Sequence, residues 1–147
     1  MFRRSKKWTG YKGDTNKKGD PHGKGVWTGS EGERYEGDWE DGKRHGKGVT
    51  EFTDGVIYEG EYREDFWHGK GVWTHPQGQK YKGSYVNGKV HGSGLMEYPD
   101  GSSFEGFFKN GNRHGRGKYT YPDGGTFEGE YLDGAANGII FEKFADG

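Results

Sequence analysis

The chain has 147 residues, of which 27% are hydrophobic and 16% aromatic, and it carries a formal net charge of −1 and no cysteine. The near-neutral charge gives no bulk attraction to nucleic acid or anionic lipid, and the lack of cysteine excludes disulfides and thiolate metal sites. No apolar run approaches the ~20 residues of a membrane-spanning helix, and no secretory signal follows the basic head of residues 1–7. We therefore expect a soluble cytoplasmic protein.

The first ten residues lie outside the repeated part of the chain and are rich in basic side chains. Arg3, Arg4, Lys6 and Lys7 are consistent either with an anchor for an acidic partner or with a solvated tail. Trp8 is positioned to fold back over the open end of the first repeat.

From residue 11 onward the sequence repeats with a fixed period. An aromatic residue opens each unit, glycine follows two residues later, and a second aromatic follows two further on in every unit but the first. A His-Gly-x-Gly segment and a closing Asp-Gly then recur in most units. A fixed period of about 20 to 50 residues is the signature of a repeat architecture. We predict a basic tail of residues 1–10 and a repeat domain of residues 11–147, with six repeats that open at Tyr11, Tyr35, Tyr58, Tyr81, Phe104 and Phe127.

Each repeat has the pattern of a β-hairpin. Tyr35, Gly37 and Trp39 are two apart, so in a strand they share one face. The joint between the two halves contains Asp-Gly or Asn-Gly in four of the repeats, and these pairs favour the positive φ values of tight hairpin turns. Glycines on the ring face leave slots for the aromatic side chains, each of which can bury ~150–250 Å². We predict an all-β fold, an elongated and twisted single-layer antiparallel β-meander of six tandem hairpins of about 23 residues.

The repeated unit resembles the MORN repeat. The resemblance rests on Tyr35-Glu36-Gly37-Asp38-Trp39 followed by Asp41-Gly42-Lys43-Arg44-His45-Gly46-Lys47-Gly48, and it extends from Tyr11 to Gly147. It implies a non-catalytic scaffold or adaptor whose sheet binds a partner protein. Similar short chains resemble components of cilia and flagella, which suggests a cytoskeletal or axonemal setting. The alternatives implied are a tether that contacts phosphoinositide membranes and the regulatory arm of an enzyme complex.

The sequence departs from this pattern in repeats one, three, five and six. Repeat one has an extra residue and lacks the second aromatic, which predicts a distorted hairpin. The other departures are Asp65-Phe66-Trp67 at the third tip, Phe107 on the polar parity of repeat five, and Ala135-Ala136, Asn137 and Ile140 in repeat six.

The sequence holds no recognisable catalytic or metal site. Residues one repeat apart are ~10 Å apart across a sheet, whereas zinc ligands lie ~2 Å from the metal. We therefore expect the recurring histidines to hydrogen-bond across their own hairpins. The Gly-Lys-Gly segments lead into no helix, as a phosphate-binding loop requires. We predict no enzyme, no cofactor and no metal, and the histidines concerned are His22, His45, His68, His91 and His114.

Three sets of residues are predicted to contact a protein partner, which would be a helix or an extended segment on the sheet face. Phe66 and Trp67 replace polar tip residues, although they could instead fold down over the sheet edge. A second set shares one repeat position and should line a shallow groove, or pack against the opening rings. A third set makes the last strand apolar on both faces, which favours end-to-end pairing with another chain, or a simple cap. The second set is Thr50, Trp73, Met96 and Tyr119, and the third is Ile139, Ile140 and Phe141.

Basic residues near the hairpin tips offer one further surface. They could form a stripe for phosphoinositide headgroups or a solvated rim. They are Lys43, Arg44, Lys89, Arg113 and Arg116.

Overall fold

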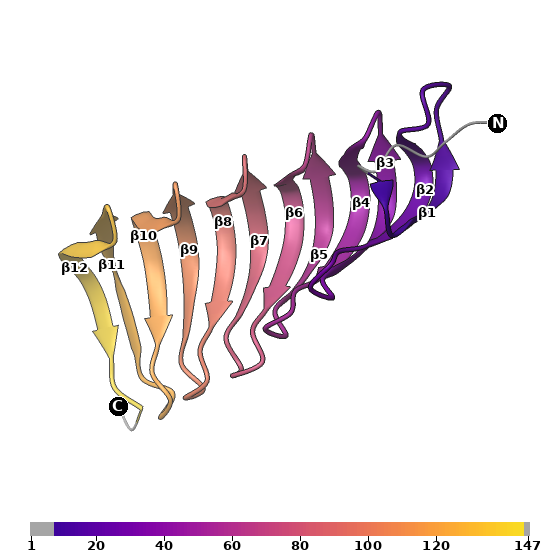
Figure 1. Cartoon of the computed structure of the whole chain (residues 1–147). Helices are drawn as coiled ribbons and strands as arrows, with labels where there is room; N and C mark the ends of the chain where they lie inside the picture. The colour runs from indigo at the N-terminus through magenta and orange to yellow at the C-terminus, as the bar shows by residue number, and fades with distance from the viewer. Residues whose placement is uncertain (1–7, 146–147) are drawn as a thin grey trace.

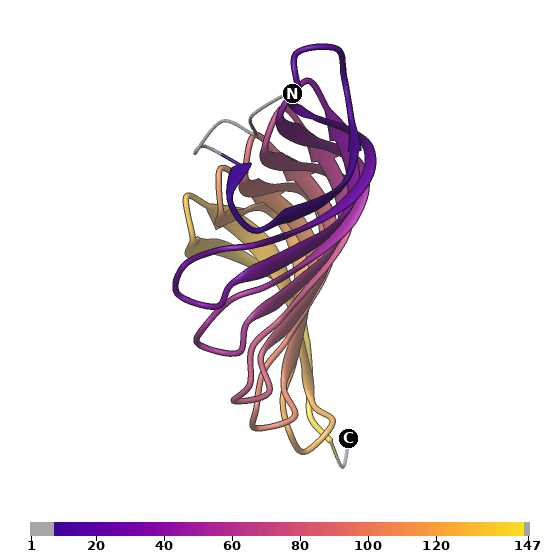
Figure 2. The ribbon, with the colours of Figure 1, turned by 45° about the vertical axis from the view of Figure 1, so that its right-hand side comes forward.

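The computed structural model describes residues 8–145, which form one open antiparallel sheet of twelve strands in chain order. Consecutive hairpins lie side by side along the molecule (Figure 1), and they fan out as the sheet twists (Figure 2). The predicted single-layer meander is thereby confirmed. The strands are β1 (Tyr11–Thr15), β2 (Pro21–Thr28), β3 (Arg34–Glu40), β4 (Lys43–Glu51), β5 (Ile57–Arg63), β6 (Phe66–Thr74), β7 (Lys80–Val86), β8 (Lys89–Glu97), β9 (Ser103–Lys109), β10 (Asn112–Thr120), β11 (Thr126–Leu132) and β12 (Ala135–Lys143).

The register aligns equivalent repeat positions into rows that cross the strands. Tyr35 pairs with Trp27 on one side and Thr50 on the other. Glycines pair with glycines in the same way from β1 to β11. Because neighbouring strands are ~4.8 Å apart, each row advances ~9.6 Å per repeat. We call this central row the glycine row; it consists of Gly13, Gly25, Gly37, Gly48, Gly60, Gly71, Gly83, Gly94, Gly106, Gly117 and Gly129.

The four hairpin tips with Asp-Gly or Asn-Gly have the predicted turn geometry, whereas the first tip is a longer loop and the third has no glycine. Asp41 and Gly42 have φ values of 45° and 84°, as the two central residues of such a turn require. Asp65 adopts φ 74° without being glycine, a conformation that costs free energy for a residue with a Cβ. Its carboxylate accepts hydrogen bonds from the backbone N–H of Arg44 (2.8 Å) and from Arg44 Nε (3.1 Å). The neighbouring repeat therefore holds this turn in place.

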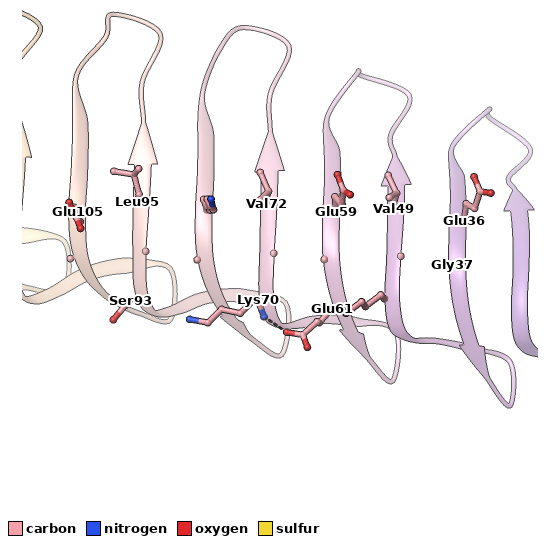
Figure 3. A pocket seen from close by; sticks show the side chains of 18 residues that line it. Glu36, Gly37, Val49, Glu59, Glu61, Lys70, Val72, Ser93, Leu95 and Glu105 are labelled. Carbon is pink, nitrogen blue, oxygen red and sulfur yellow. Dashed lines mark hydrogen bonds between the residues drawn. The ribbon is translucent and has the colours of Figure 1, made fainter.

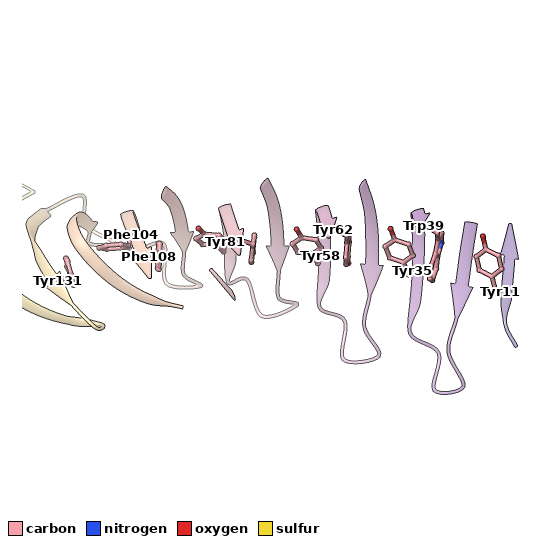
Figure 4. Packing of buried hydrophobic residues seen from close by; sticks show 10 residues of the cluster. Tyr11, Tyr35, Trp39, Tyr58, Tyr62, Tyr81, Phe104, Phe108 and Tyr131 are labelled. Atoms are coloured by element: carbon pink, nitrogen blue, oxygen red, sulfur yellow. The ribbon is translucent and has the colours of Figure 1, made fainter. Parts of the chain in front are cut away.

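The core is a continuous ladder of aromatic rings on one face of the sheet (Figure 4). Tyr35 meets Trp39 of its own repeat at 5.0 Å between ring centroids and Tyr62 of the next repeat at 5.1 Å, both edge to face. The same alternation continues to the contact between Phe104 and Tyr131 at 5.0 Å. Such pairs contribute ~0.5–1.5 kcal/mol each beyond their buried area. The opening rings of repeats one to five are between 0% and 1% exposed, although the sheet has a single layer.

The glycine row explains how rings can be buried in one layer. A Cβ placed on Gly71 would lie 2.7 Å from the Tyr58 ring, closer than such atoms pack. The rings therefore lie flat over backbone that has no side chain, as the sequence predicts. Burial raises the pKa of Tyr35 and Tyr58, and it raises the pKa of Tyr81 to about 12.

Trp8 closes the N-terminal end of the ladder. Its ring meets Trp39 at 6.1 Å, and its indole N–H donates to Asp20 Oδ1 at 2.9 Å. Repeat one differs from the others at its tip, where residues 16–20 join β1 to β2 and the Asn16 N–H donates to the Asp20 carbonyl at 2.9 Å. Its register shift between Gly13 and Thr15 recurs in the later hairpins. Trp8 thus packs near the place where the first repeat lacks its second aromatic.

Candidate partner-binding groove

A groove of about 1170 Å³ lies on the sheet face opposite the aromatic ladder. It runs across the strands from β3 to β9, and part of the glycine row, from Gly37 to Gly106, forms its floor (Figure 3). The same missing side chains that admit the rings on one face thus leave a hollow on the other. Each strand from β3 to β9 pairs with a neighbour on both sides, so the floor is internal sheet.

The side of the groove toward the inter-repeat loops alternates apolar and charged side chains. Val49, Val72 and Leu95 come from β4, β6 and β8, at one repeat position. Charged residues from the odd strands lie between them and pair with them in register. We call this row of seven residues the apolar wall, after Val49, Val72 and Leu95. The charged residues between them are Glu36, Glu59, Lys82 and Glu105.

The side toward the hairpin tips, which we call the polar wall, is formed by Lys47, Glu61, Lys70 and Ser93. Glu61 Oε2 accepts the backbone N–H of Lys70 at 2.5 Å, where the strand bulges opposite it. The carboxylate thus supplies the hydrogen bond that the sheet ladder leaves unmade at the bulge. This hydrogen bond gives Glu61 a structural role in the sheet.

In repeat two, Asp38 lies beside the groove and accepts the equivalent hydrogen bond at the bulge of its hairpin. Its Oδ2 accepts the backbone N–H of Lys47 at 3.0 Å, and its Oδ1 accepts from Lys24 Nζ. Partial burial favours the neutral acid, but these hydrogen bonds and the two nearby lysines outweigh it, so the pKa of Asp38 lies below its usual value. The carboxylate is therefore a charged brace at neutral pH.

Repeats four and five lack this brace. Ser84 and Phe107 stand where the earlier repeats have Asp38 and Glu61. Phe107 is 56% exposed and pairs with Ser93, at the end of the polar wall. The sequence marks Phe107 as unusual, but only the register shows that it lies beside a groove.

The four residues predicted to line a groove, Thr50, Trp73, Met96 and Tyr119, lie on the face that carries the rings, opposite the groove described above. Thr50 is 3% exposed and hydrogen-bonds to the Tyr62 hydroxyl. The other three are partly buried against the core. The opening rings thus occupy the space beside them, and a contact with a partner there stays a prediction.

The two aromatic residues of the third tip have different environments. Trp67 stacks on Tyr58 with ring centroids 4.4 Å apart and planes 5° apart, whereas Phe66 is 54% exposed. Repeats two and five place arginine at the Trp67 position, and Arg113 lies 4.6 Å from the centre of the Phe104 ring. Trp67 therefore covers an opening ring, and Phe66 has the more accessible surface. The partner contact predicted for both stays a prediction.

The sequence predicts that the recurring histidines bond across their own hairpins, whereas four of them accept a hydrogen bond from the following hairpin. His45 also lies across its own hairpin from Glu40, with Nε2 3.2 Å from Oε2. His22 Nδ1 accepts the backbone N–H of Asp41 at 3.2 Å, and His45 Nδ1 accepts that of Glu64 at 3.3 Å. His68 and His91 repeat the contact with Asn87 and Asn110 at 3.4 and 3.3 Å. They tie each tip turn to the preceding repeat. Within residues 8–145 no three His, Asp or Glu side chains converge as a metal site would require.

The last strand forms the open C-terminal edge of the sheet. β12 pairs only with β11, and its backbone shifts register twice. The side chains of Ile139, Ile140 and Phe141 lie outside the described part of the structure, so end-to-end pairing stays a prediction.

Comparison with known proteins identifies the repeated unit. The family described as the MORN repeat matches five successive stretches, residues 17–34, 35–57, 58–80, 81–103 and 104–126. The structure adds the hairpin β11–β12 in the same architecture. No curated protein matches the chain.

A search of solved structures finds a weak likeness. The TCP domain of SAS-4 (dCPAP) of Drosophila melanogaster, in complex with a proline rich motif of Ana2 (dSTIL), is 13% identical. The alignment covers 88% of this chain and 84% of that one, with a TM-score of 0.33. A likeness of this size does not bear on the function of the present chain.

Proposed function

Because the chain belongs to the MORN-repeat family, we propose that it is a non-catalytic scaffold whose sheet binds a segment of a partner protein. The groove over the glycine row is the observation that carries this proposal. It is long, open to solvent along its length and bordered by apolar side chains at regular intervals. Internal strands with paired edges give it a rigid floor.

Cross-linking from within the groove tests this proposal. A photo-reactive residue at Ser93, which is exposed on the polar wall, should form adducts with a partner segment in the native cell. The matched control carries the same group at Thr53, which is exposed in an inter-repeat loop. Adducts at Ser93 that are lost when Val72→Lys is added support the groove. Equal adducts from both positions, or none from Ser93, would overturn it.

For the setting we propose the cytoplasm and, within it, a cytoskeletal or ciliary assembly. The support is the resemblance of such repeat chains to cilium components, which is an argument from fold and family. Fluorescent tagging in the native cell tests it, since a diffuse signal with no cytoskeletal or ciliary enrichment would contradict the assembly.

The membrane-tether alternative has less support, because two of the basic tip residues are engaged elsewhere. Arg44 bonds to Asp65 and lies 5.4 Å from the Tyr62 ring centre. Arg113 donates to the Tyr98 hydroxyl at 2.6 Å and covers the Phe104 ring. Co-sedimentation of the chain with phosphoinositide vesicles would support this alternative if the substitutions Lys43→Glu and Lys89→Glu abolished the co-sedimentation.

A further inference from the structure

We propose that the groove receives a segment in the polyproline II conformation that runs across the strands, with an apolar residue at every third position and basic residues between. This inference rests on the proposed function and specifies the chemistry of the partner. Four properties of the groove support it: the paired floor, the width, the spacing of the apolar wall and the charge of that wall.

The floor excludes recognition by strand addition. A peptide that extends a sheet needs an edge with unpaired N–H and C=O groups, and every strand under the groove is paired on both sides. The occupant must therefore keep its own backbone hydrated. Polyproline II meets this condition, because it makes no internal backbone hydrogen bonds and stays fully solvated.

The width excludes a helix that reaches the floor. The two walls are separated along each strand by one glycine, as Gly48 separates Lys47 from Val49. Two residues of strand span ~6.8 Å, whereas a helix with its side chains is ~10–12 Å across. A single extended chain can lie on the glycine row where a helix would rest on the walls.

The spacing of the apolar wall matches the polyproline II period. Val49, Val72 and Leu95 occupy one position in three successive repeats, so they recur every ~9.6 Å. Polyproline II has three residues per turn and rises ~3.1 Å per residue, which returns the same face every ~9.3 Å. A β-conformation would turn every third side chain to the opposite face, because its side chains alternate with a period of two.

The charge of the apolar wall selects basic residues between the apolar ones. Glu59 and Glu105 point into the groove region between apolar neighbours, and neither makes an ion pair within the described chain. Glu36 at the first end pairs with Arg34 at 2.8 Å, and Lys82 lies midway. The wall therefore carries two unpaired carboxylates against one ammonium, and it favours arginine or lysine in the occupant beside Glu59 and Glu105.

A designed peptide tests the period directly. Twelve residues that repeat Leu-Pro-Arg, labelled with fluorescein, are titrated with the intact chain and followed by anisotropy. The control peptide has the same composition with its leucines adjacent. We expect the periodic peptide to bind at least about tenfold more tightly, since one well-buried apolar side chain is worth about that factor. Equal affinity for the two peptides would overturn the proposal.

Protein variants locate the contact. Val72→Lys should lower the affinity for the periodic peptide by about tenfold or more, because the central apolar contact is lost. Val86→Lys is the matched control, because Val86 is 40% exposed and does not line the groove. Glu59→Gln with Glu105→Gln should weaken binding and reduce its dependence on salt. If Val86→Lys and Val72→Lys weaken binding equally, the peptide does not occupy the groove and the proposal fails.

Selection from a random peptide library separates this inference from the proposed function. Random 16-residue peptides are selected on the intact chain and then depleted on the Val72→Lys variant. Groove-specific peptides with apolar residues every third position support the inference. Groove-specific peptides with a helical period or with none would overturn it and leave the proposed function intact. The absence of groove-specific peptides would overturn both.

Discussion

Repeats one to four and repeats five and six bury the same opening ring in different ways. In the first four repeats the ring is tyrosine, and its hydroxyl donates to the carbonyl three residues later, as Tyr35 does to Asp38 at 2.7 Å. Repeats five and six open with Phe104 and Phe127, which have no hydroxyl. Phe104 is nevertheless 0% exposed. Burial over glycine therefore places the ring, and the hydroxyl adds a local hydrogen bond.

Repeats one to three also differ from repeat five at the bulge of the hairpin. Repeats one to three provide an acidic side chain that accepts the backbone N–H of Lys24, Lys47 or Lys70. Repeat five has Phe107 there, which can accept nothing. The sheet continues across it, so the bulge does not depend on the carboxylate. Repeat five thus has exposed apolar surface where the first three repeats have a polar brace, whereas repeat six again has an acidic residue, Glu130, at this position.

High pH should produce the largest loss of stability, and the repeats that open with tyrosine should lose stability first. The folded-state pKa of Tyr81 is about 12, above the ordinary value of about 10, and burial raises that of Tyr35, Tyr58 and Tyr85 as well. Folding thus favours the neutral hydroxyls, and their contribution to stability is complete below pH ~10 and is lost as the pH rises through the folded-state values.

Circular dichroism and tyrosinate absorbance, recorded together across this range, check that prediction. Unfolding should accompany ionisation. Full ionisation of all the tyrosines near pH 10 without loss of the sheet would contradict burial of the rings.

Gly71→Ala should destabilise the chain by about 3 kcal/mol, as overpacking of a close-packed core does. Its new methyl group would lie within 2.7 Å of the Tyr58 ring. The control is Gly138→Ala in repeat six, where nothing lies within 4 Å of the added Cβ. Urea unfolding of the two variants measures the difference. Equal stabilities would show that the rings do not need the glycine row.

Tyr35→Phe should lower the free energy of unfolding by about 1 kcal/mol, because the variant loses the hydrogen bond from the Tyr35 hydroxyl to the Asp38 carbonyl. The change gives repeat two the phenylalanine that opens repeat five. Phe104→Tyr is the reciprocal change and should stabilise the chain, since the new hydroxyl would face the carbonyl of Phe107. Thermal melts of both variants and of the double variant measure the two effects. A cost for Tyr35→Phe without a gain for Phe104→Tyr would mean that the later repeats cannot use the hydroxyl.

Phe107→Asp should give the smallest change, a stabilisation of about 0.5 kcal/mol through a new acceptor for the bulge N–H of Arg116. Phe107→Ala separates the gain of the acceptor from the removal of an exposed ring. Chemical unfolding of the three proteins measures the effect. Destabilisation by Phe107→Asp but not by Phe107→Ala would show that the bulge of repeat five has a different geometry.

Local sequence patterns were sufficient for the architecture. The alternation of Tyr35, Gly37 and Trp39 identifies one face of a strand, and the tip dipeptides identify the turns, because both signals act within a few residues. Equal spacing of the repeats then requires that neighbouring hairpins pair in the same register. The strand order, the ring face and the slots over glycine all follow from these signals.

Only the tertiary structure shows which contacts join one repeat to the next. The bond from His22 to the turn at Asp41, and the stacking of Trp67 on Tyr58, depend on the three-dimensional course of the bulge and tip. The groove also depends on it, since the sequence suggests two faces but not which one is hollow. Sequence spacing fixes which side chains share a row, whereas twist and ring packing decide how much space remains above each row. The sequence thus determined the sheet, and the packing of its rings decided where a partner could lie.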